Sequence, residues 1–139
     1  MPVDKPYNQY KKTQITTANQ GKLIVMLYDG ALRFVNRAIE LIPSKSIEDI
    51  HINIVRAQDI IGELITSLNM DAGEIAHRLF SIYMYINRRL TAANIHKDEK
   101  PLLEVKKYLT ELREAWEEAA KKVQPDTIEA EKGGINIAT

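Results

Sequence analysis

Apolar residues recur every three or four positions in four long stretches of the chain, and short polar, proline- or glycine-containing segments separate these stretches. Such spacing gathers apolar side chains on one face of an α-helix, and no stretch shows the sustained two-residue alternation of a half-buried strand. The pattern predicts helices over roughly 20–42, 46–69 and 71–96, and a fourth that has Pro101 in its first turn and ends near 123. We therefore expect a chain whose regular structure is entirely helical.

Residues typical of helix ends lie between these stretches. Asn19 is a candidate N-cap for the first helix, and Pro43 is expected to stop it. Ser46 can cap the second helix, and Asp71 or Gly73 opens the third. Connections of about three to six residues between long helices imply antiparallel neighbours.

Each predicted helix has one apolar stripe that can face a common core. The stripes comprise Leu27, Ala31, Phe34, Ala38 and Leu41; Ile50, Ile54, Ala57, Ile61, Leu64 and Leu68; Ile75, Leu79, Tyr83, Ile86, Leu90 and Ala93; and Leu102, Val105, Leu109, Leu112, Trp116 and Ala119. Four such helices predict an all-α fold, an antiparallel up-down four-helix bundle. The predicted organisation is an N-terminal lead over 1–18, with Tyr7 and Tyr10 as its apolar anchors, the bundle over 19–123, and a loose tail over 124–139.

Three of the helices carry more apolar residues than one core stripe needs. The second stripe on the first helix comprises Val25, Tyr28, Leu32, Val35 and Ile39. On the second helix, Ile52 and Val55 lie away from the core positions, and on the third, Phe80 and Met84 flank the core on one side and Tyr85 on the other. One interpretation is a wide buried face on a helix wedged between two neighbours. The other is an exposed apolar groove for an amphipathic partner, for which methionine and aromatic side chains are suited.

Composition narrows the possible functions. The chain has 139 residues, which fits one domain, and its 19 basic residues balance 19 acidic ones, so a nucleic-acid partner is not expected. No apolar run is long enough to span a membrane, and no secretory signal is visible at Met1–Lys5. Together with the absence of cysteine, these features favour a cytoplasmic protein without membrane insertion.

No arrangement of residues points to catalysis, a metal or a cofactor. His51, His77 and His96 are the only histidines, and none has a second ligand at an inward-facing metal spacing. The chain contains no phosphate-binding glycine loop and no nucleophile elbow. The acidic residues over 111–118 are interspersed with Arg113 and followed by Lys121-Lys122, as on a solvated helix surface. We expect no enzyme activity, no cofactor and no metal.

Five groups of short strings lie along the chain in an order and spacing found in one known family. They are Tyr7-Asn8-Gln9-Tyr10; Met26-Leu27-Tyr28-Asp29-Gly30-Ala31 followed by Arg33-Phe34; Arg56-Ala57-Gln58-Asp59-Ile60-Ile61 followed by Glu63-Leu64; Tyr83-Met84-Tyr85 followed by Arg88-Arg89-Leu90 and Ala93-Asn94; and Arg113-Glu114-Ala115-Trp116. Over about residues 7–120 the chain thus resembles the flagellar secretion chaperone family, FliS. One departure is Asn19-Gln20, where that family commonly has Ser-Pro.

The resemblance implies an antiparallel four-helix bundle whose ligand is the C-terminal segment of flagellin. In that family the segment wraps around the bundle, which prevents premature polymerisation and assists delivery to the flagellar type III export apparatus. Flagellin is therefore the expected partner, together with export-gate components, and we expect a monomer or weak dimer when the chain is free. The predicted partner-binding residues are Tyr7, Tyr10, Ile52, Val55, Phe80 and Met84.

The resemblance also suggests roles for four further residues. Leu27 and Trp116 are expected in the core, Asp29 is expected to accept a hydrogen bond from the lead or a neighbouring helix, and Gly30 indicates close approach of two helices. Two other classes of function stay open at this point. One is a structural or regulatory adaptor that self-associates through its surplus apolar surface, and the other is a cofactor-binding bundle.

Overall fold

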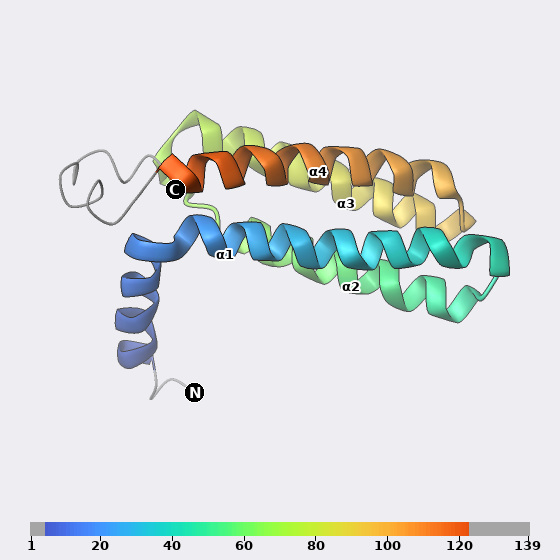
Figure 1. Ribbon diagram of the computed structural model, residues 1–139, viewed down its shortest axis with the longest axis horizontal. Coiled ribbons are helices and arrows are strands. Elements are labelled where there is room, and N and C mark those ends of the chain that lie inside the picture. The colour runs from blue at the N-terminus through green and yellow to red at the C-terminus, as the bar shows by residue number, and fades with distance from the viewer. Residues whose placement is uncertain (1–4, 123–139) are drawn as a thin grey trace.

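The computed structural model describes the backbone of residues 5–122 and the side chains of residues 20–122 (Figure 1). Its elements are α1 (Lys5–Leu41), η2 (Ile42–Ser44), α2 (Ile47–Thr66), η3 (Met70–Ala72), α3 (Glu74–His96) and α4 (Glu99–Lys122). The four α-helices and two short 3-10 turns account for all regular structure in this part of the chain, so the predicted all-α fold is confirmed.

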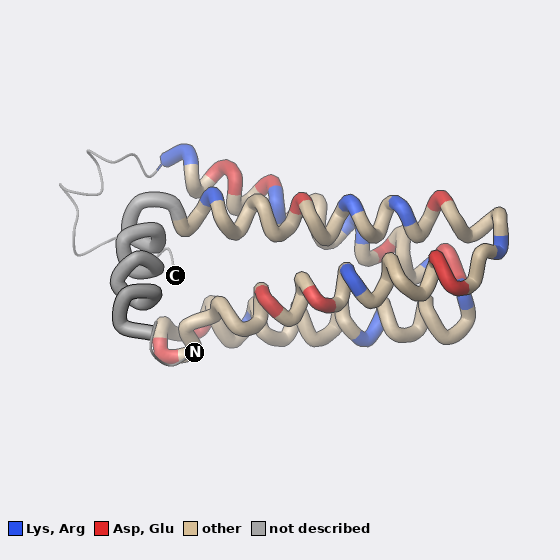
Figure 2. Tube along the Cα trace, turned by 90° about the horizontal axis from the view of Figure 1, so that it is seen from below, with Lys and Arg blue, Asp and Glu red and all other residues tan. Residues whose placement is uncertain are grey.

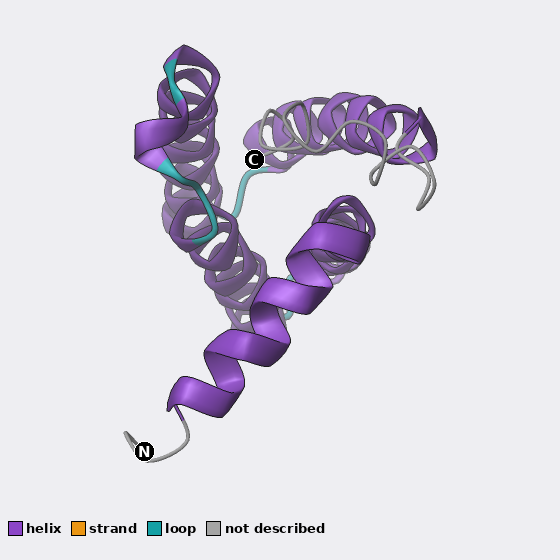
Figure 3. Cartoon of the chain, turned by 90° about the vertical axis from the view of Figure 1, so that its left-hand side faces the viewer, coloured by secondary structure: helices purple, strands orange, loops and turns teal. Residues whose placement is uncertain are grey.

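The helices form an antiparallel bundle in which each contacts the next and α4 returns to α1. Figure 1 shows α1 and α2 in one layer and α3 and α4 in the other, and Figure 3 shows the same helices seen from one end. Helix α1 packs most extensively, against both α2 and α4. The two seams of α3, with α2 and with α4, are less extensive. Figure 2 shows that basic and acidic residues alternate along the described helices and do not gather on one element.

Helix ends follow local chemistry, with one correction to a predicted boundary and one to a predicted cap. Helix α1 begins at Lys5, not at Gln20, so Asn19 lies inside the helix and does not cap it. Ser46 does occupy the N-cap position of α2, but its side chain makes no capping hydrogen bond, and its hydroxyl lies 3.1 Å from the Ser44 hydroxyl. Helix α3 begins after Gly73, whose φ of 110° suits glycine. The division into lead, bundle and tail stays a prediction, and the tail lies outside the described residues.

The core is built from all four helices and contains no buried charged side chain among the described residues. Its fully buried large side chains are Tyr28, Val35, Ile50, Ile54, Ile61, Leu64, Tyr83, Ile86, Leu90, Leu102, Val105 and Leu109. The predicted stripe of α2 is confirmed from Ile50 to Leu64, with Leu68 partly buried.

The predicted stripes of the other helices need correction. On α1 the core centres on Tyr28 and Val35, which belonged to the surplus stripe, while Leu27 and Phe34 are only partly buried. The reason is that α1 is wedged between two neighbours and buries a wide arc. On α3, Ile75 is exposed and Ala76 is buried in its place. On α4, Ala119 is exposed, and Leu112 and Trp116 are partly buried against the core.

Gly30 has the role expected for it. A Cβ atom at this position would meet the Ile60 side chain at 3.0 Å, tighter than ordinary van der Waals contact. At Gly21, an added Cβ atom would lie 2.8 Å from the Cβ atom of Ala120 in α4, so glycine leaves room for Ala120. Glycine in a helix costs about 1 kcal/mol relative to alanine, and at these two positions it lets α1 approach α2 and α4 closely.

Candidate protein-binding surface

The first candidate surface lies along the seam between α2 and α3, and we call it the α2–α3 seam. Hydrogen bonds fix how the two helices face each other: Gln58 Nε2 donates to Thr91 Oγ1 at 2.9 Å and to the Asn87 carbonyl at 3.3 Å. Near one end of the seam, His51 Nδ1 lies 2.8 Å from Asn94 Nδ2. These pairs show which sides of α2 and α3 border the seam.

Phe80 and Met84 lie on the side of α3 that carries Asn87 and Thr91, and therefore beside α2. Phe80 is 37 % exposed and Met84 is partly buried. Moving four residues along antiparallel helices in opposite directions from the Gln58 contacts brings Gly62 to the level of Met84. The two predicted residues of α3 thus share one stretch of the seam with Gly62.

Within the described chain, no close contact explains why residue 62 is glycine. A Cβ atom built there meets no heavy atom within 4 Å, in contrast to Gly21 and Gly30. An exposed mid-helix glycine lowers helix stability by about 1 kcal/mol relative to alanine. Its consequence is a strip of bare α2 backbone at the level of Met84, open to anything that docks on the seam.

Ile52 and Val55 lie nearer the other end of α2 and are separated from this stretch by the polar Gln58–Thr91 contact. Val55 is partly buried and lies about 60° around the helix from Gln58, at the edge of the seam. Ile52 is 38 % exposed and points further from α3. The structure therefore brings Phe80 and Met84 together, and it places Ile52 and Val55 as a separate apolar pair. The side chains of Tyr7 and Tyr10 lie outside the described residues.

One buried polar atom on this side of α3 lacks a partner. The Asn87 side-chain oxygen is inaccessible to solvent and accepts no hydrogen bond from the described residues. An unsatisfied buried polar group costs about 1–3 kcal/mol. The α2–α3 side of α3 therefore contains a buried polar atom whose hydrogen bond is missing within the described part of the chain, which lowers the stability of this part of the bundle.

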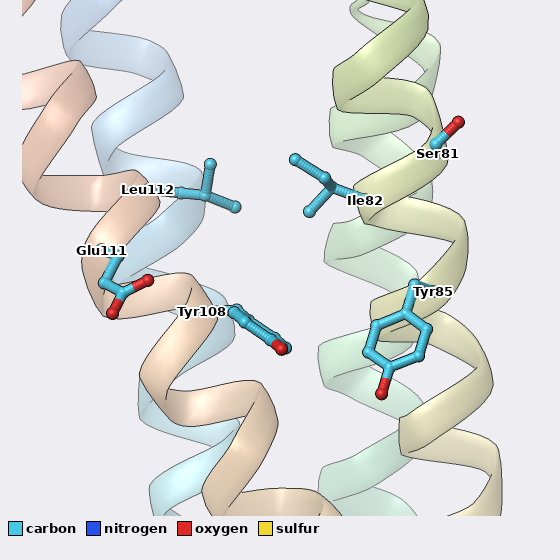
Figure 4. Close-up of a pocket in the computed structure, with 6 residues that line it drawn as sticks. All are labelled: Ser81, Ile82, Tyr85, Tyr108, Glu111 and Leu112. Atoms are coloured by element: carbon cyan, nitrogen blue, oxygen red, sulfur yellow. The ribbon is translucent and has the colours of Figure 1, made fainter.

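The second candidate surface is a groove of about 520 Å³ on the opposite side of α3, which we call the α3–α4 groove. Its lining consists of Ser81, Ile82, Tyr85, Tyr108, Glu111 and Leu112. Figure 4 shows Ile82 and Leu112 pointing toward one another from the two helices, with Tyr85 and Tyr108 below them. The two tyrosine rings meet edge to face, with centroids 6.1 Å apart.

A polar cluster stands beside the tyrosines of the groove. The Tyr85 hydroxyl donates to Glu104 Oε2 at 2.6 Å, and Arg89 Nε donates to Glu104 Oε1 at 2.7 Å. The hydrogen bonds from Tyr85 and Arg89 lower the pKa of the Glu104 carboxyl below its ordinary value. Glu104 thus ties α4 to α3 next to the groove.

The opposite side of α4 is held to α1 by a charged contact. Arg113 Nε donates to Asp29, and Arg113 Nη1 donates to Glu117 at 2.8 Å. The expectation that Asp29 accepts a hydrogen bond is confirmed, with α4 as the donor helix. In the core, the hydroxyls of Tyr28 and Tyr83 lie 2.5 Å apart, and burial raises the pKa of both.

Metal-binding clusters and membrane-spanning helices are two further kinds of feature that could lie among the described residues. Among them, no three histidine, aspartate or glutamate side chains come together as a metal site would require. Within the same part of the chain, no helix is both long and apolar enough to cross a membrane. The candidate surfaces described here are the two apolar surfaces on either side of α3.

Comparison with known proteins decides the family. A sequence model described as "Flagellar protein FliS" matches residues 3–123. The chain belongs to the FliS family. A "Flagellar secretion chaperone FliS" from Bacillus subtilis (strain 168) is 36 % identical over 91 % of this chain and 94 % of its own length. Relatives of the same name from Campylobacter jejuni and Escherichia coli are 37 % and 28 % identical, covering 81 % and 78 % of this chain and 88 % and 81 % of their own lengths.

Membership in the FliS family agrees with the resemblance found in the short strings, and it spans the whole described bundle. Sequence reasoning identified Phe80, Met84 and Tyr85 as flanking residues. It missed the open space at Gly62 and the contribution of Ile82 and Tyr108 to the α3–α4 groove. Gly62 carried one usable signal, since it is a glycine inside a strongly periodic helix, four residues before the last residue of that helix.

Proposed function

We propose that this protein is a cytoplasmic export chaperone that binds the C-terminal segment of flagellin. Binding would prevent premature polymerisation and assist delivery of the subunit to the flagellar type III export apparatus, where export-gate components are further partners. The observation that carries the proposal is membership in the FliS family over residues 3–123, with relatives named flagellar secretion chaperones. On this proposal the protein acts by binding and needs no catalysis, cofactor or metal.

The proposed binding surface is the α2–α3 seam together with Tyr7 and Tyr10 of the lead. Phe80 and Met84 give a partner helix an adaptable apolar contact, because methionine and aromatic side chains adjust to irregular surfaces. Ile52 and Val55 provide a second contact about 10 Å further along α2, estimated from the helical rise between Val55 and Gly62. A segment that engages both stretches must be long and must cross the polar Gln58–Thr91 contact.

Gly62 supports the same surface in a different way. The bare backbone at this position lets a ligand's main chain or small side chain come closer to α2 than any other residue type would allow. Glycine at position 62 lowers helix stability, and no contact within the described chain requires it. It is explained if the ligand occupies the open space above this residue.

The physical cost of binding suits a chaperone that must release its cargo. A disordered segment that orders on binding loses about 2–5 kcal/mol of the gross interaction energy. It can cover a large area with modest net affinity. Exposed apolar side chains on the chaperone are covered in the complex and are uncovered again when the export machinery removes the segment.

The experiment that tests the function uses purified protein and monomeric flagellin in size-exclusion chromatography. Full-length flagellin should elute as a complex with the chaperone, and flagellin that lacks its C-terminal segment should elute alone. Equal binding of the truncated flagellin would refute the proposed ligand segment. Sedimentation of the free protein is a companion measurement, and a tight dimer that buries the α2–α3 seam would favour the self-associating adaptor instead.

A further inference from the structure

The α3–α4 groove is a second apolar feature, on the side of α3 opposite the proposed flagellin surface. Its side chains that face one another are Ile82 and Leu112, and Ile82 and Tyr85 are both 37 % exposed. Two apolar positions follow one another along its length: the Ile82–Leu112 pair, and the Tyr85–Tyr108 pair one helical turn away. At 1.5 Å per residue, these two positions lie about 5–6 Å apart along the helices.

The residues that follow α4 have a sequence suited to this spacing. Pro125 cannot continue the helix, and Gly133-Gly134 allow a sharp change of direction. Directly after them come Ile135-Asn136-Ile137. In an extended chain the side chains of residues i and i+2 lie on the same side, about 6.6–6.8 Å apart. Ile135 and Ile137 therefore match the two apolar positions of the groove.

The length of the intervening chain also fits. Leu112 and Tyr108 lie ten and fourteen residues before Lys122 on α4, which corresponds to about 15–21 Å at the helical rise. The thirteen steps from Lys122 to Ile135 reach at most about 43–47 Å, so this length of chain is sufficient to return to the groove. Because the two isoleucines belong to the same molecule as the groove, the contact is intramolecular and its effective concentration is raised.

We propose that Ile135 and Ile137 fold back in the same molecule and fill the α3–α4 groove. Ile137 or Ile135 packs between Ile82 and Leu112, and the other isoleucine packs on the Tyr85–Tyr108 pair. The segment after α4 then covers exposed apolar surface that the bundle leaves open. This inference goes beyond the proposed flagellin function, because it concerns the free chaperone and a different face of α3.

The test uses the full chain with one spin label. The sequence has no cysteine, so a nitroxide on Thr139→Cys labels a single site. With methyl-labelled protein, the Ile82 and Leu112 resonances should lose intensity relative to the reduced label. The Ile52 and Val55 resonances on the α2–α3 seam should keep theirs. Weak, uniform loss over all four residues, or equal loss at the seam, would overturn the proposal.

Two matched double variants identify the side chains responsible. Ile135→Asp with Ile137→Asp should abolish the selective loss at Ile82 and Leu112. Asn136→Asp with Ala138→Asp adds the same charge on the alternate side of the segment and should preserve that loss. If both pairs abolish it equally, the isoleucines do not fill the groove.

A mixing experiment separates an intramolecular contact from a second copy. Spin-labelled protein without isotope is mixed with isotope-labelled protein without the spin label, at the same total concentration. No intensity loss at Ile82 or Leu112 is expected in this mixture. Loss there would mean that the groove takes the segment of another molecule, which contradicts the proposal. No flagellin is present, so failure of this test leaves the proposed export function standing.

Discussion

Helices α1 and α3 both carry more apolar residues than a single core stripe, yet the bundle treats them differently. On α1 the two stripes merge, and Tyr28 and Val35 are fully buried because α2 and α4 pack closely against both sides. On α3, Phe80 on one flank and Tyr85 on the other remain 37 % exposed. Surplus apolar residues are therefore available to a partner only where neighbouring helices leave them uncovered.

Small residues help to explain why α1 is covered and α3 is not. Gly21 and Gly30 let α4 and α2 approach α1 until an added Cβ atom would lie 2.8–3.0 Å from its neighbours. The seam of α3 with α2 has the opposite features, an empty space above Gly62 and an unsatisfied oxygen on Asn87 among the described residues. Helix α1 therefore holds the bundle together, and α3 presents its surfaces.

The largest effect is expected when a charge is placed on the buried face of α1. Val35→Glu should unfold the bundle, at a cost of more than about 4 kcal/mol, because the carboxylate is buried without a partner. Circular dichroism during thermal unfolding measures the loss. Met26→Glu is the matched control, since Met26 lies on the same helix and is 64 % exposed. Comparable destabilisation by both changes would show that α1 is not the buried helix described here.

The contact between the two contrasted helices is tested by the Tyr28–Tyr83 hydroxyl pair. Tyr28→Phe should cost about 1–3 kcal/mol, because it leaves the buried Tyr83 hydroxyl without this partner. Tyr83→Phe in the same background should restore part of that loss, since the unpaired hydroxyl is then removed. Urea unfolding of the two single variants and the double variant measures the coupling. Strict additivity would mean that the hydroxyls do not stabilise one another.

Filling the open space on the α2–α3 seam should stabilise the bundle and weaken binding at the same time. Gly62→Ala should raise the free energy of unfolding by about 0.5–1 kcal/mol, because alanine favours the helix and its Cβ meets no neighbour. The same change should weaken flagellin binding, which isothermal titration calorimetry measures. Thr110→Ala on α4 is the control, expected to favour its helix without affecting binding. If Gly62→Ala is stabilising and binds flagellin as before, the glycine has no role in recognition.

The smallest expected effect concerns the polar cluster that joins α3 to α4. Glu104→Gln should lower the free energy of unfolding at pH 7 by less than about 1 kcal/mol, because the pair is partly exposed. The folded pKa of Glu104 is below its ordinary 4.5, so its contribution is present above pH 4.5 and is lost as the pH falls through the folded pKa. Urea unfolding at pH 7 and pH 3 should show a larger difference from the parent protein at pH 7 than at pH 3. An equal difference at both pH values would mean that the charge of Glu104 is not responsible.

Much of the fold was predictable because helical periodicity and helix-breaking residues are local signals. The stripe of α2 from Ile50 to Leu64 was predicted correctly, and so was the break at Pro43. The start of α1 was not, because residues 1–18 were interpreted as a lead separate from the first helix, although proline, here Pro6, is tolerated in the first turn of a helix. The burial of Tyr28 and Val35 also needed the structure, since it depends on how closely two neighbours approach.

The candidate surfaces were only partly predictable for the same physical reason. Phe80 and Met84 could be identified as surplus to one stripe, but their exposure depends on the position of α2. The α3–α4 groove combines residues about 30 positions apart, such as Ile82 and Leu112, and no local pattern links them. An added Cβ atom would contact a neighbouring side chain at Gly30 but would meet open space at Gly62. This difference depends on how the helices pack, so the local sequence does not reveal it.

The proposal that flagellin binds the α2–α3 seam is tested most directly by the affinity of Phe80→Glu for flagellin, measured together with the thermal stability of this variant. If the α2–α3 seam is the binding surface, affinity should fall at least tenfold, or about 1.4 kcal/mol, while the melting temperature changes little. Leu103→Glu is the matched control on α4, where the side chain is 46 % exposed, and it should bind as the parent protein does. Unchanged affinity for Phe80→Glu, or a large loss of helicity, would contradict an exposed binding surface on α3.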